Sequence, residues 1–211
     1  MNRAVFFDRD GTLNAMVYNT EFGLVDSPAN PGEFRLLPHV AEAVQIVKEL
    51  GFLAVVISNQ PGIAKGKFSP ALLDRMTEKM LSELAGEGAQ IDAVYYCYHH
   101  PEGVVKEYQV SCDCRKPKPG LLIRAAADLN IDLGSSYMVG DGITDIQAGQ
   151  AAGTKTILLY PSLKCYICEE LSRRRVQPDH IVSGLLQASG LIQKLENVSL
   201  ASRSGLGMVS T

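Results

Sequence analysis

Short apolar runs alternate with amphipathic segments along this chain, and the alternation limits the possible folds more than any other feature. The apolar runs are rich in Val, Ile, Tyr or Phe, as buried strands are; they cover residues 4–7, 53–57, 93–97, 137–139 and 156–159. The segments between them have helical periodicity, over residues 39–50, 69–84, 119–129 and 143–152. Strands that alternate with helices predict an α/β fold of the Rossmann-like type, a parallel sheet with helices on both faces.

Length and apolar content predict one domain. A chain of 211 residues with 46% hydrophobic content can bury a single substantial core, and we expect the domain to cover residues 1–196. Two segments interrupt the alternation, 14–38 with many Asn, Pro and Gly, and 99–119 with His, Cys, Lys and Pro. We expect both to be insertions beside a functional site. Residues 197–211 are rich in Ser and Gly and predict a mobile tail.

Charge and hydropathy exclude two classes of partner. The net charge of −3 comes from interspersed basic and acidic residues, so the chain offers no positive field to a nucleic acid. No apolar run approaches the ~20 residues that cross a bilayer, and Asp8 and Asp10 interrupt any signal-peptide pattern. We therefore expect a soluble cytoplasmic protein that binds neither nucleic acid nor membrane, and nothing in the sequence argues for more than a monomer.

Two carboxylates follow the first predicted strand at alternate positions. In Asp8-Arg9-Asp10-Gly11-Thr12, the glycine lets the backbone turn sharply, so the side chains of Asp8 and Asp10 can converge on one point. A hard divalent cation such as Mg²⁺ would relieve their repulsion and leave one carboxylate oxygen free to attack. Taken alone, such a pair is more often an acidic turn in which Asp10 is a local cap.

Three further polar groups stand next to predicted strands or helices. Ser58-Asn59-Gln60 ends the second strand, where a hydroxyl and backbone N–H groups can hold phosphoryl oxygens. Lys116 lies in a proline-rich turn that would hold its ammonium rigidly, and Asp141 and Asp145 form an acidic pair between the fourth strand and its helix. Each group alone has an ordinary alternative, as a helix cap, a turn residue or a solubilising lysine.

Together these groups resemble the signature of the haloacid dehalogenase (HAD) superfamily. The matches are Asp8 and Asp10 to its D-x-D-G-T motif, Ser58 to its second motif, Lys116 to its third, and Asp141 with Asp145 to its G-D-x-x-x-D motif. The resemblance implies that Asp8 attacks phosphorus to form an aspartyl-phosphate, and that Asp10 protonates the leaving oxygen and then activates water. Ser58 and Lys116 would neutralise the phosphoryl oxygens, which phosphoryl transfer requires.

The same resemblance implies a metal site. A Mg²⁺ ion would be held by Asp8, Asp141 and the backbone carbonyl of Asp10, and Asp145 would orient Lys116 or a water on the metal. The aspartate at Asp10 also favours phosphate hydrolysis over carbon–halogen chemistry, because release of phosphate needs a general acid and base near the nucleophile.

Thiol and imidazole side chains gather in residues 97–114. Cys97-Tyr98-His99 and Cys112-Asp113-Cys114 form a C-x-H…C-x-C pattern that holds three of the chain's five cysteines. Four such ligands suit a tetrahedral Zn²⁺ and close its coordination shell, so we expect a structural zinc site. His100 could replace His99 as the imidazole ligand.

This segment narrows the resemblance within the superfamily. Residues 95–103 and 112–117 look like the zinc loop of D-glycero-D-manno-heptose 1,7-bisphosphate phosphatases and the related histidinol-phosphatase domains, and residues 59–66 resemble them as well. The resemblance implies a zinc loop in place of a large cap domain, with the ligands Cys97, His99, Cys112 and Cys114. It also implies substrate contacts from Asn59, Gln60 and Arg115, the last with a second phosphate or the sugar.

The expected activity is Mg²⁺-dependent removal of the C7 phosphate from a heptose 1,7-bisphosphate, on the way to nucleotide-activated heptose for lipopolysaccharide. Histidinol phosphate is the alternative substrate within the family. A nucleic-acid 3′-phosphatase is disfavoured because no basic or aromatic stripe is present. A non-catalytic interaction module stabilised by zinc is the alternative of another class, and the intact set of motif residues weighs against it.

The remaining cysteines and histidines have ordinary interpretations. Cys165 and Cys168 form a second C-x-x-C pair, but two thiols without further ligands are more often reduced residues of a helix than a metal or redox site. His39 is expected to begin a helix and His180 to lie at a strand edge.

Overall fold

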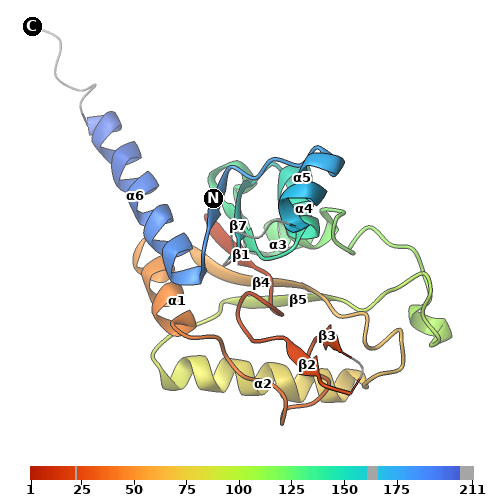
Figure 1. The fold of residues 1–211 in the computed structure, drawn as a ribbon. Coiled ribbons are helices and arrows are strands. Elements are labelled where there is room, and N and C mark those ends of the chain that lie inside the picture. Colours follow the sequence, from red (N-terminus) through yellow and green to blue (C-terminus); the bar gives the residue numbers. More distant parts are fainter. Residues whose placement is uncertain (22, 161–165, 205–211) are drawn as a thin grey trace, which may run out of the picture.

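A computed structural model of the chain describes residues 1–21, 23–160 and 166–204. At its centre lies a sheet of six strands in the order β5-β4-β1-β6-β7-β8 (Figure 1). The strands are β1 (Ala4–Phe7), β4 (Leu53–Asn59), β5 (Ala93–Cys97), β6 (Tyr137–Gly140), β7 (Lys155–Leu159) and β8 (His180–Val182). Every neighbouring pair is parallel, which confirms the predicted sheet.

Helices cover both faces of this sheet (Figure 1). One face carries α1 (Val40–Glu49), α2 (Pro70–Gly86) and α6 (Leu185–Ser204). The other face carries α3 (Gly120–Leu129), α4 (Ile143–Ala152) and α5 (Tyr166–Arg174). Two short 3₁₀ turns, η1 (Lys106–Tyr108) and η2 (Leu133–Ser135), lie in the connections. The predicted helices at 39–50, 69–84, 119–129 and 143–152 correspond to α1 to α4.

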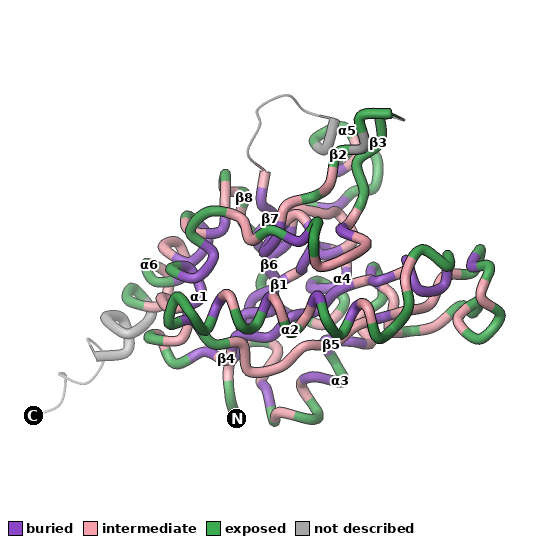
Figure 2. Tube along the Cα trace, turned by 90° about the horizontal axis from the view of Figure 1, so that it is seen from below, coloured by how far each residue is buried: buried purple, intermediate pink, exposed green. Residues whose placement is uncertain are grey.

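The core is built by the alternation of side chains along the strands. Val5 and Phe7 pack in the cluster that holds α1, α2 and α6, while Ala4 and Phe6 pack with Leu122 on the opposite face. Successive residues of a strand point to opposite faces, so β1 feeds both halves of the core and is buried along its whole length (Figure 2). This rigid strand ends where the acidic motif begins.

Two segments stand over the carboxyl edge of the sheet. The first lies between β1 and α1 and contains the antiparallel pair β2 (Val17–Asn19) and β3 (Leu24–Asp26). The second, residues 98–119, connects β5 to α3. Both expected insertions are present, and neither is large enough to form a separate cap domain.

The ends of several elements differ from the prediction. β4 continues beyond residue 57, because Ser58 and Asn59 still pair with β5. The tail predicted from residue 197 is wrong up to Ser204, since α6 reaches that residue. Residues 197–204 contain neither glycine nor proline, so nothing in that stretch stops the helix. The rest of the predicted tail, 205–211, lies outside the described residues.

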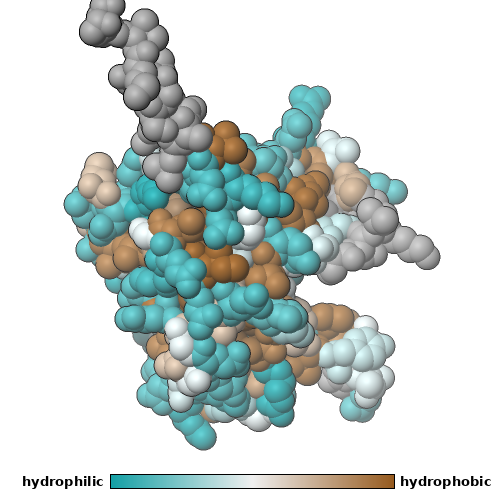
Figure 3. Space-filling model, turned by 90° about the vertical axis from the view of Figure 1, so that its left-hand side faces the viewer, coloured by the Kyte–Doolittle hydropathy of each residue, from teal (hydrophilic) through white to brown (hydrophobic). Residues whose placement is uncertain are grey.

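The helices and one face of the surface bear on the expectation that the protein binds no membrane. On the face drawn in Figure 3, brown apolar side chains are scattered among teal polar ones. None of the described helices is long and apolar enough to span a bilayer. The expectations of a monomer and of a cytoplasmic location stay predictions. Cys165 lies outside the described residues, so the interpretation of the Cys165 and Cys168 pair also stays a prediction.

Candidate active site

Three neighbouring strands bring the motif residues to one edge of the sheet. Asp8 directly follows β1, Ser58 lies at the end of β4, and Asp141 directly follows β6. Because β4, β1 and β6 are adjacent and parallel, their carboxyl ends meet at the same place. The backbone N–H of Asp8 donates to the carbonyl of Val139 at 3.0 Å, so Asp8 is still anchored to the sheet.

Three carboxylates converge at this edge. One oxygen each of Asp8, Asp141 and Asp145 lies within 4.8 Å of the other two. Gly11 makes room for the group: its φ is +89°, and a Cβ there would stand 2.2 Å from Asp141 Oδ2. Thr12 Oγ1 donates to Asp141 Oδ1 at 3.3 Å. The sequence prediction that Asp8 and Asp141 lie together is confirmed by this geometry.

Lys116 is the cation of the group. Its Nζ lies 2.7 Å from Asp8 Oδ1 and 2.6 Å from Asp145 Oδ1, and it donates to the carbonyl of Ile57 at 2.9 Å. The side chain is buried. Burial opposes the charge of the ammonium, but the carboxylates of Asp145 and Asp8 outweigh it and raise the pKa of Lys116 above its usual value. Lys116 is therefore a fixed cation beside Asp8.

The positive charge of Lys116 does not balance the negative charges of the three carboxylates. Burial, followed by the charge of Asp145, raises the pKa of Asp8 to about 7, although Lys116 pulls it down. Burial and Asp145 likewise raise the pKa of Asp141 to about 6. Carboxylate oxygens are ligands that Mg²⁺ prefers, and a divalent cation among them would offset this repulsion. The residues present thus fit a magnesium site.

Asp10 is not among the carboxylates that lie within 4.8 Å of one another. Its oxygens accept from Arg9 Nε and Nη2 at 2.9 to 3.0 Å, from Asn14 Nδ2 at 3.0 Å and from Gln60 Nε2 at 2.8 Å. Sequence analysis missed Arg9 and Asn14, because a charged residue between two aspartates and a loop asparagine look like exposed residues. The structure buries both completely.

The residues after Ser58 make contacts that the motif did not predict. Gln60 Nε2 also donates to Ser58 Oγ at 3.0 Å, and the backbone N–H of Gln60 donates to the carbonyl of Cys97 at 2.7 Å. That N–H is not available to a phosphoryl oxygen, so the expectation that it would bind one is wrong. The amide of Asn59 bonds the backbone of Lys116. The roles of Asn59 and Gln60 as substrate contacts stay predictions.

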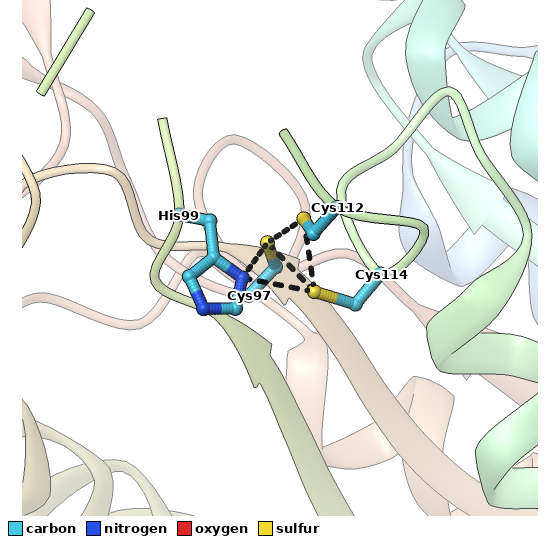
Figure 4. A group of neighbouring side chains, drawn as sticks. All are labelled: Cys97, His99, Cys112 and Cys114. Carbon is cyan, nitrogen blue, oxygen red and sulfur yellow. Dashed lines mark hydrogen bonds between the residues drawn. The ribbon is translucent and has the colours of Figure 1, made fainter. Parts of the chain in front are cut away.

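A second cluster lies in the loop between β5 and α3. One ligand atom each of Cys97, His99, Cys112 and Cys114 lies within 4.8 Å of the others (Figure 4). The three sulfur atoms are 3.2 to 3.5 Å apart, and His99 Nδ1 is 3.3 Å from the sulfur of Cys114. Three thiols and an imidazole around one point fit a tetrahedral zinc ion.

The structure also distinguishes the two candidate histidines. His99 belongs to the cluster, whereas His100 Nδ1 accepts the backbone N–H of Glu102 at 3.1 Å. A short piece of chain joins the cluster to the carboxylate group, because Cys114 stands two positions before Lys116. The carbonyl of Asp113 accepts the N–H of Gly120 at 3.0 Å, which closes this piece of chain against the start of α3.

Two hollows flank the carboxylate group. One of about 450 Å³ is mostly apolar and is lined by Thr12, Met16 and Asp141 among others. The other, of about 260 Å³, lies between Lys116 and the cysteine loop and is lined by His100, Arg115 and Lys118 among others. The second hollow is basic and suits an anionic group of a substrate.

Comparisons with known proteins agree with this geometry. Residues 113–188 match the family described as HAD-hydrolase-like. The D-glycero-beta-D-manno-heptose-1,7-bisphosphate 7-phosphatase of Escherichia coli K12 is 45% identical over 157 residues, 74% of this chain and 78% of that protein. The protein of the same description from Pasteurella multocida is 44% identical over 159 residues, 75% of this chain and 82% of that one.

A solved structure supports the same relationship. The D,D-heptose 1,7-bisphosphate phosphatase from B. bronchiseptica, in complex with magnesium and phosphate, superposes with a TM-score of 0.74. It is 27% identical, and the match covers 91% of this chain and 98% of that one.

Proposed function

Because this chain belongs to the HAD-like family of D-glycero-beta-D-manno-heptose-1,7-bisphosphate 7-phosphatases, we propose that it removes the C7 phosphate of a heptose 1,7-bisphosphate. It is a HAD-type phosphatase. The observation that carries the proposal is the buried carboxylate of Asp8, 2.7 Å from Lys116 and grouped with Asp141 and Asp145. A non-catalytic module would have no need to keep this repulsive group.

The first chemical step is attack by Asp8 on phosphorus. Asp8 Oδ1 is held by Lys116, so its other oxygen attacks, the bond between phosphorus and the ester oxygen breaks, and an aspartyl-phosphate forms. Lys116 and the hydroxyl of Ser58 stabilise charge on the phosphoryl oxygens. Mg²⁺ would be held by Asp8, Asp141 and the carbonyl of Asp10, where it neutralises phosphoryl charge.

Asp10 carries the proton in both steps. It gives a proton to the leaving ester oxygen, and it then takes one from the water that attacks the aspartyl-phosphate and releases phosphate. Asp145 bonds Lys116 at 2.6 Å and the N–H of Gly142 at 2.9 Å. It therefore orients the lysine from the first turn of α4.

The basic hollow supports a substrate with a second phosphate. Arg115 follows the metal-binding loop directly, and its Nη1 donates to the carbonyl of His99 at 3.4 Å. Lys118 lines the same hollow and forms an exposed ion pair with Asp113. With one phosphate beside Asp8, the other phosphate of a bisphosphate would lie among these cations.

The test is phosphate release from the two anomers of heptose 1,7-bisphosphate, from heptose 7-phosphate and from histidinol phosphate. We expect turnover of a bisphosphate anomer with Mg²⁺, none with EDTA, and none in Asp8→Asn. Preference for histidinol phosphate would reassign the substrate, and no turnover of any phosphate ester would refute the proposal.

An arginine variant tests the second phosphate. Arg115→Ala should raise KM for the bisphosphate at least ~10-fold, because charge-assisted hydrogen bonds to phosphate are among the strong ones, and it should change KM for the 7-phosphate little. Arg124→Ala, at an exposed helix position, is the matched control. An equal change in KM for both substrates on Arg115→Ala would refute the placement of the second phosphate in the basic hollow.

A further inference from the structure

We propose that Arg9, the residue between the two motif aspartates, is a positioning residue that orients the general acid and base Asp10. The inference rests on the proposed function and adds a role that its mechanism does not include. The side chain of Arg9 is 0% exposed, and it is one of the largest fully buried side chains of the described residues. A guanidinium loses a great deal of hydration on burial and is tolerated only where it is paired. The pairing with Asp10 is therefore what allows the fold to bury Arg9.

Two nitrogens of the Arg9 guanidinium donate to the two carboxylate oxygens of Asp10. Arg9 Nε donates to Asp10 Oδ1 at 3.0 Å, and Nη2 donates to Oδ1 at 2.9 Å and to Oδ2 at 3.0 Å. Such a contact fixes the plane of a carboxylate as well as its place, because the guanidinium presents its N–H groups in a rigid fork. Orientation is what an acid and base residue needs, since its proton must lie in line with the oxygen that receives it.

Gln60 connects this pair to the phosphate side of the site. Its Oε1 accepts from Arg9 Nη2 at 3.1 Å, and its Nε2 donates to Asp10 Oδ2 at 2.8 Å and to Ser58 Oγ at 3.0 Å. One amide thus sets the distance between the acid and base residue and the hydroxyl proposed to hold phosphate. Arg9 holds that amide as well as the carboxylate.

Asp10 accepts hydrogen bonds on both oxygens, so it must exchange one of them to reach a substrate. The Arg9 contact adds the attraction of two opposite charges to its hydrogen bonds, whereas the amides of Gln60 and Asn14 are neutral donors to the same carboxylate. The amides of Gln60 and Asn14 therefore yield first, and Arg9 remains as the pivot of the carboxylate. This order makes Arg9 matter for turnover rather than for substrate binding.

The far side of Arg9 is anchored by aromatic packing. Its Cζ lies 5.6 Å from the centre of the Tyr96 ring, and the Tyr96 hydroxyl is 2.9 Å from Thr77 Oγ1 of α2. Because Arg9 contributes to packing, its substitution can lower stability, and a loss of activity alone would not identify its role.

The experiment is a double-mutant cycle on turnover of heptose 1,7-bisphosphate, with Arg9→Lys, Asp10→Asn and the double variant. Arg9→Lys keeps the charge and loses the fork. We expect kcat to fall at least ~10-fold with KM within ~3-fold, because general acid and base catalysis contributes about 10²–10⁴-fold. In the Asp10→Asn background, Arg9→Lys should cost less than ~2-fold more, since residues that act through one another are not additive.

Two controls separate positioning from folding. Arg3→Lys makes the same substitution just before the other end of β1, where Arg3 pairs with Glu196, and it should leave kcat unchanged. Melting temperature and zinc content report on the fold of each variant. If Arg9→Lys does not fold, Arg9→Gln carries the test, because it keeps an N–H donor but loses the charge and the fork. The same loss of kcat and the same absence of an added loss in Asp10→Asn are expected.

The outcomes distinguish this inference from the proposed function. An inactive wild-type protein refutes the proposed function and the role of Arg9 with it. An active wild type with unchanged kcat in folded Arg9→Lys, or in Arg9→Gln where that variant carries the test, overturns the inference alone. A full additional loss in the Asp10→Asn background does so too, because Arg9 would then act independently of Asp10.

Discussion

Asn59 hydrogen-bonds both polar groups of the Lys116 backbone. Its Oδ1 accepts the N–H of Lys116 at 3.0 Å, and its Nδ2 donates to the carbonyl of Lys116 at 3.1 Å. The pair joins the end of β4 to the loop before α3. Because the ammonium of Lys116 reaches Asp8 and Asp145 from this anchored backbone, Asn59 fixes the place of the cation.

Replacement of Asn59 should therefore impair turnover through Lys116. Asn59→Ala leaves a backbone donor and an acceptor without partners, at about 1–3 kcal/mol for each buried group, and we expect kcat to fall at least ~10-fold, about 1.4 kcal/mol. Steady-state kinetics and melting temperature measure the two effects. Asn30→Ala, at a half-buried loop asparagine whose bond to Glu33 is exposed, should leave kcat unchanged. An Asn59→Ala enzyme with normal kcat would refute this role.

The positions of Asp8 and Asp141 could be predicted because each follows a strand of a parallel sheet. The apolar runs before Asp8 and Asp141 identified β1 and β6, and carboxyl ends of parallel strands meet at one edge. The cluster of cysteines and His99 was predictable for a different reason. Three thiols and an imidazole within eighteen residues, 97–114, have few uses other than holding a metal.

The orientation of Asp10 could not be predicted, since it depends on residues far away in sequence. Alternate positions in a strand suggested that Asp8 and Asp10 converge, but Gln60 from β4's end and the buried Arg9 draw Asp10 aside. The contact of the Asn59 side chain could not be predicted either, because its partner Lys116 is 57 positions away in the sequence. Such contacts arise only when the fold is complete.

The pH dependence of stability follows from the raised pKa values. In the metal-free protein, burial and Asp145 raise the pKa of Asp8 from 3.8 to about 7 and that of Asp141 to about 6. The folded state then binds protons more tightly than the unfolded chain. This contribution to stability is therefore lost as the pH rises from the unfolded pKa of these carboxyls to their folded pKa. We expect the melting temperature of the metal-free protein to fall between about pH 4 and about pH 7.

Magnesium should reverse that trend, because it binds the deprotonated carboxylates. The increase in melting temperature on adding Mg²⁺ should be larger at the higher pH. Asp8→Asn removes the main titrating group and is the control. If Asp8→Asn shows the same pH slope as the wild type, the slope does not come from Asp8.

Gly11 should not tolerate a side chain. A Cβ there would stand 2.2 Å from Asp141 Oδ2, and the φ of +89° is strained for any other residue. We expect Gly11→Ala to displace Asp141 and weaken Mg²⁺ binding at least ~10-fold, about 1.4 kcal/mol, as measured by the Mg²⁺ dependence of turnover. Gly51→Ala also has a positive φ, but nothing lies near its Cβ; it should lower stability and leave the Mg²⁺ dependence unchanged, and equal Mg²⁺ dependence in both variants would refute the steric argument.

The two neighbouring histidines should differ in their effect on zinc. His99→Ala removes a member of the cluster, whereas His100→Ala removes a side chain that accepts only a local N–H of Glu102. Binding of a structural zinc contributes about 10–16 kcal/mol, so we expect His99→Ala to lose zinc and to melt at least ~4 °C lower, about 1–2 kcal/mol. Elemental analysis and thermal melting check both variants, and equal zinc content in both would place the metal elsewhere.

Removal of zinc should also abolish activity, although no zinc ligand belongs to the acidic group. Cys114 stands two positions before Lys116, so a metal held by Cys114 would fix the chain next to the lysine, in addition to the contacts of Asn59 with Lys116 and of Asp113 with Gly120. Loss of the metal frees the loop, and Lys116 then leaves Asp8 and Asp145. We expect a chelated enzyme to lose at least ~90% of kcat, about 1.4 kcal/mol, even in saturating Mg²⁺, and to recover with Zn²⁺ but not with more Mg²⁺. Full activity after complete removal of zinc would show that the contacts of Asn59 hold Lys116 in place without the metal.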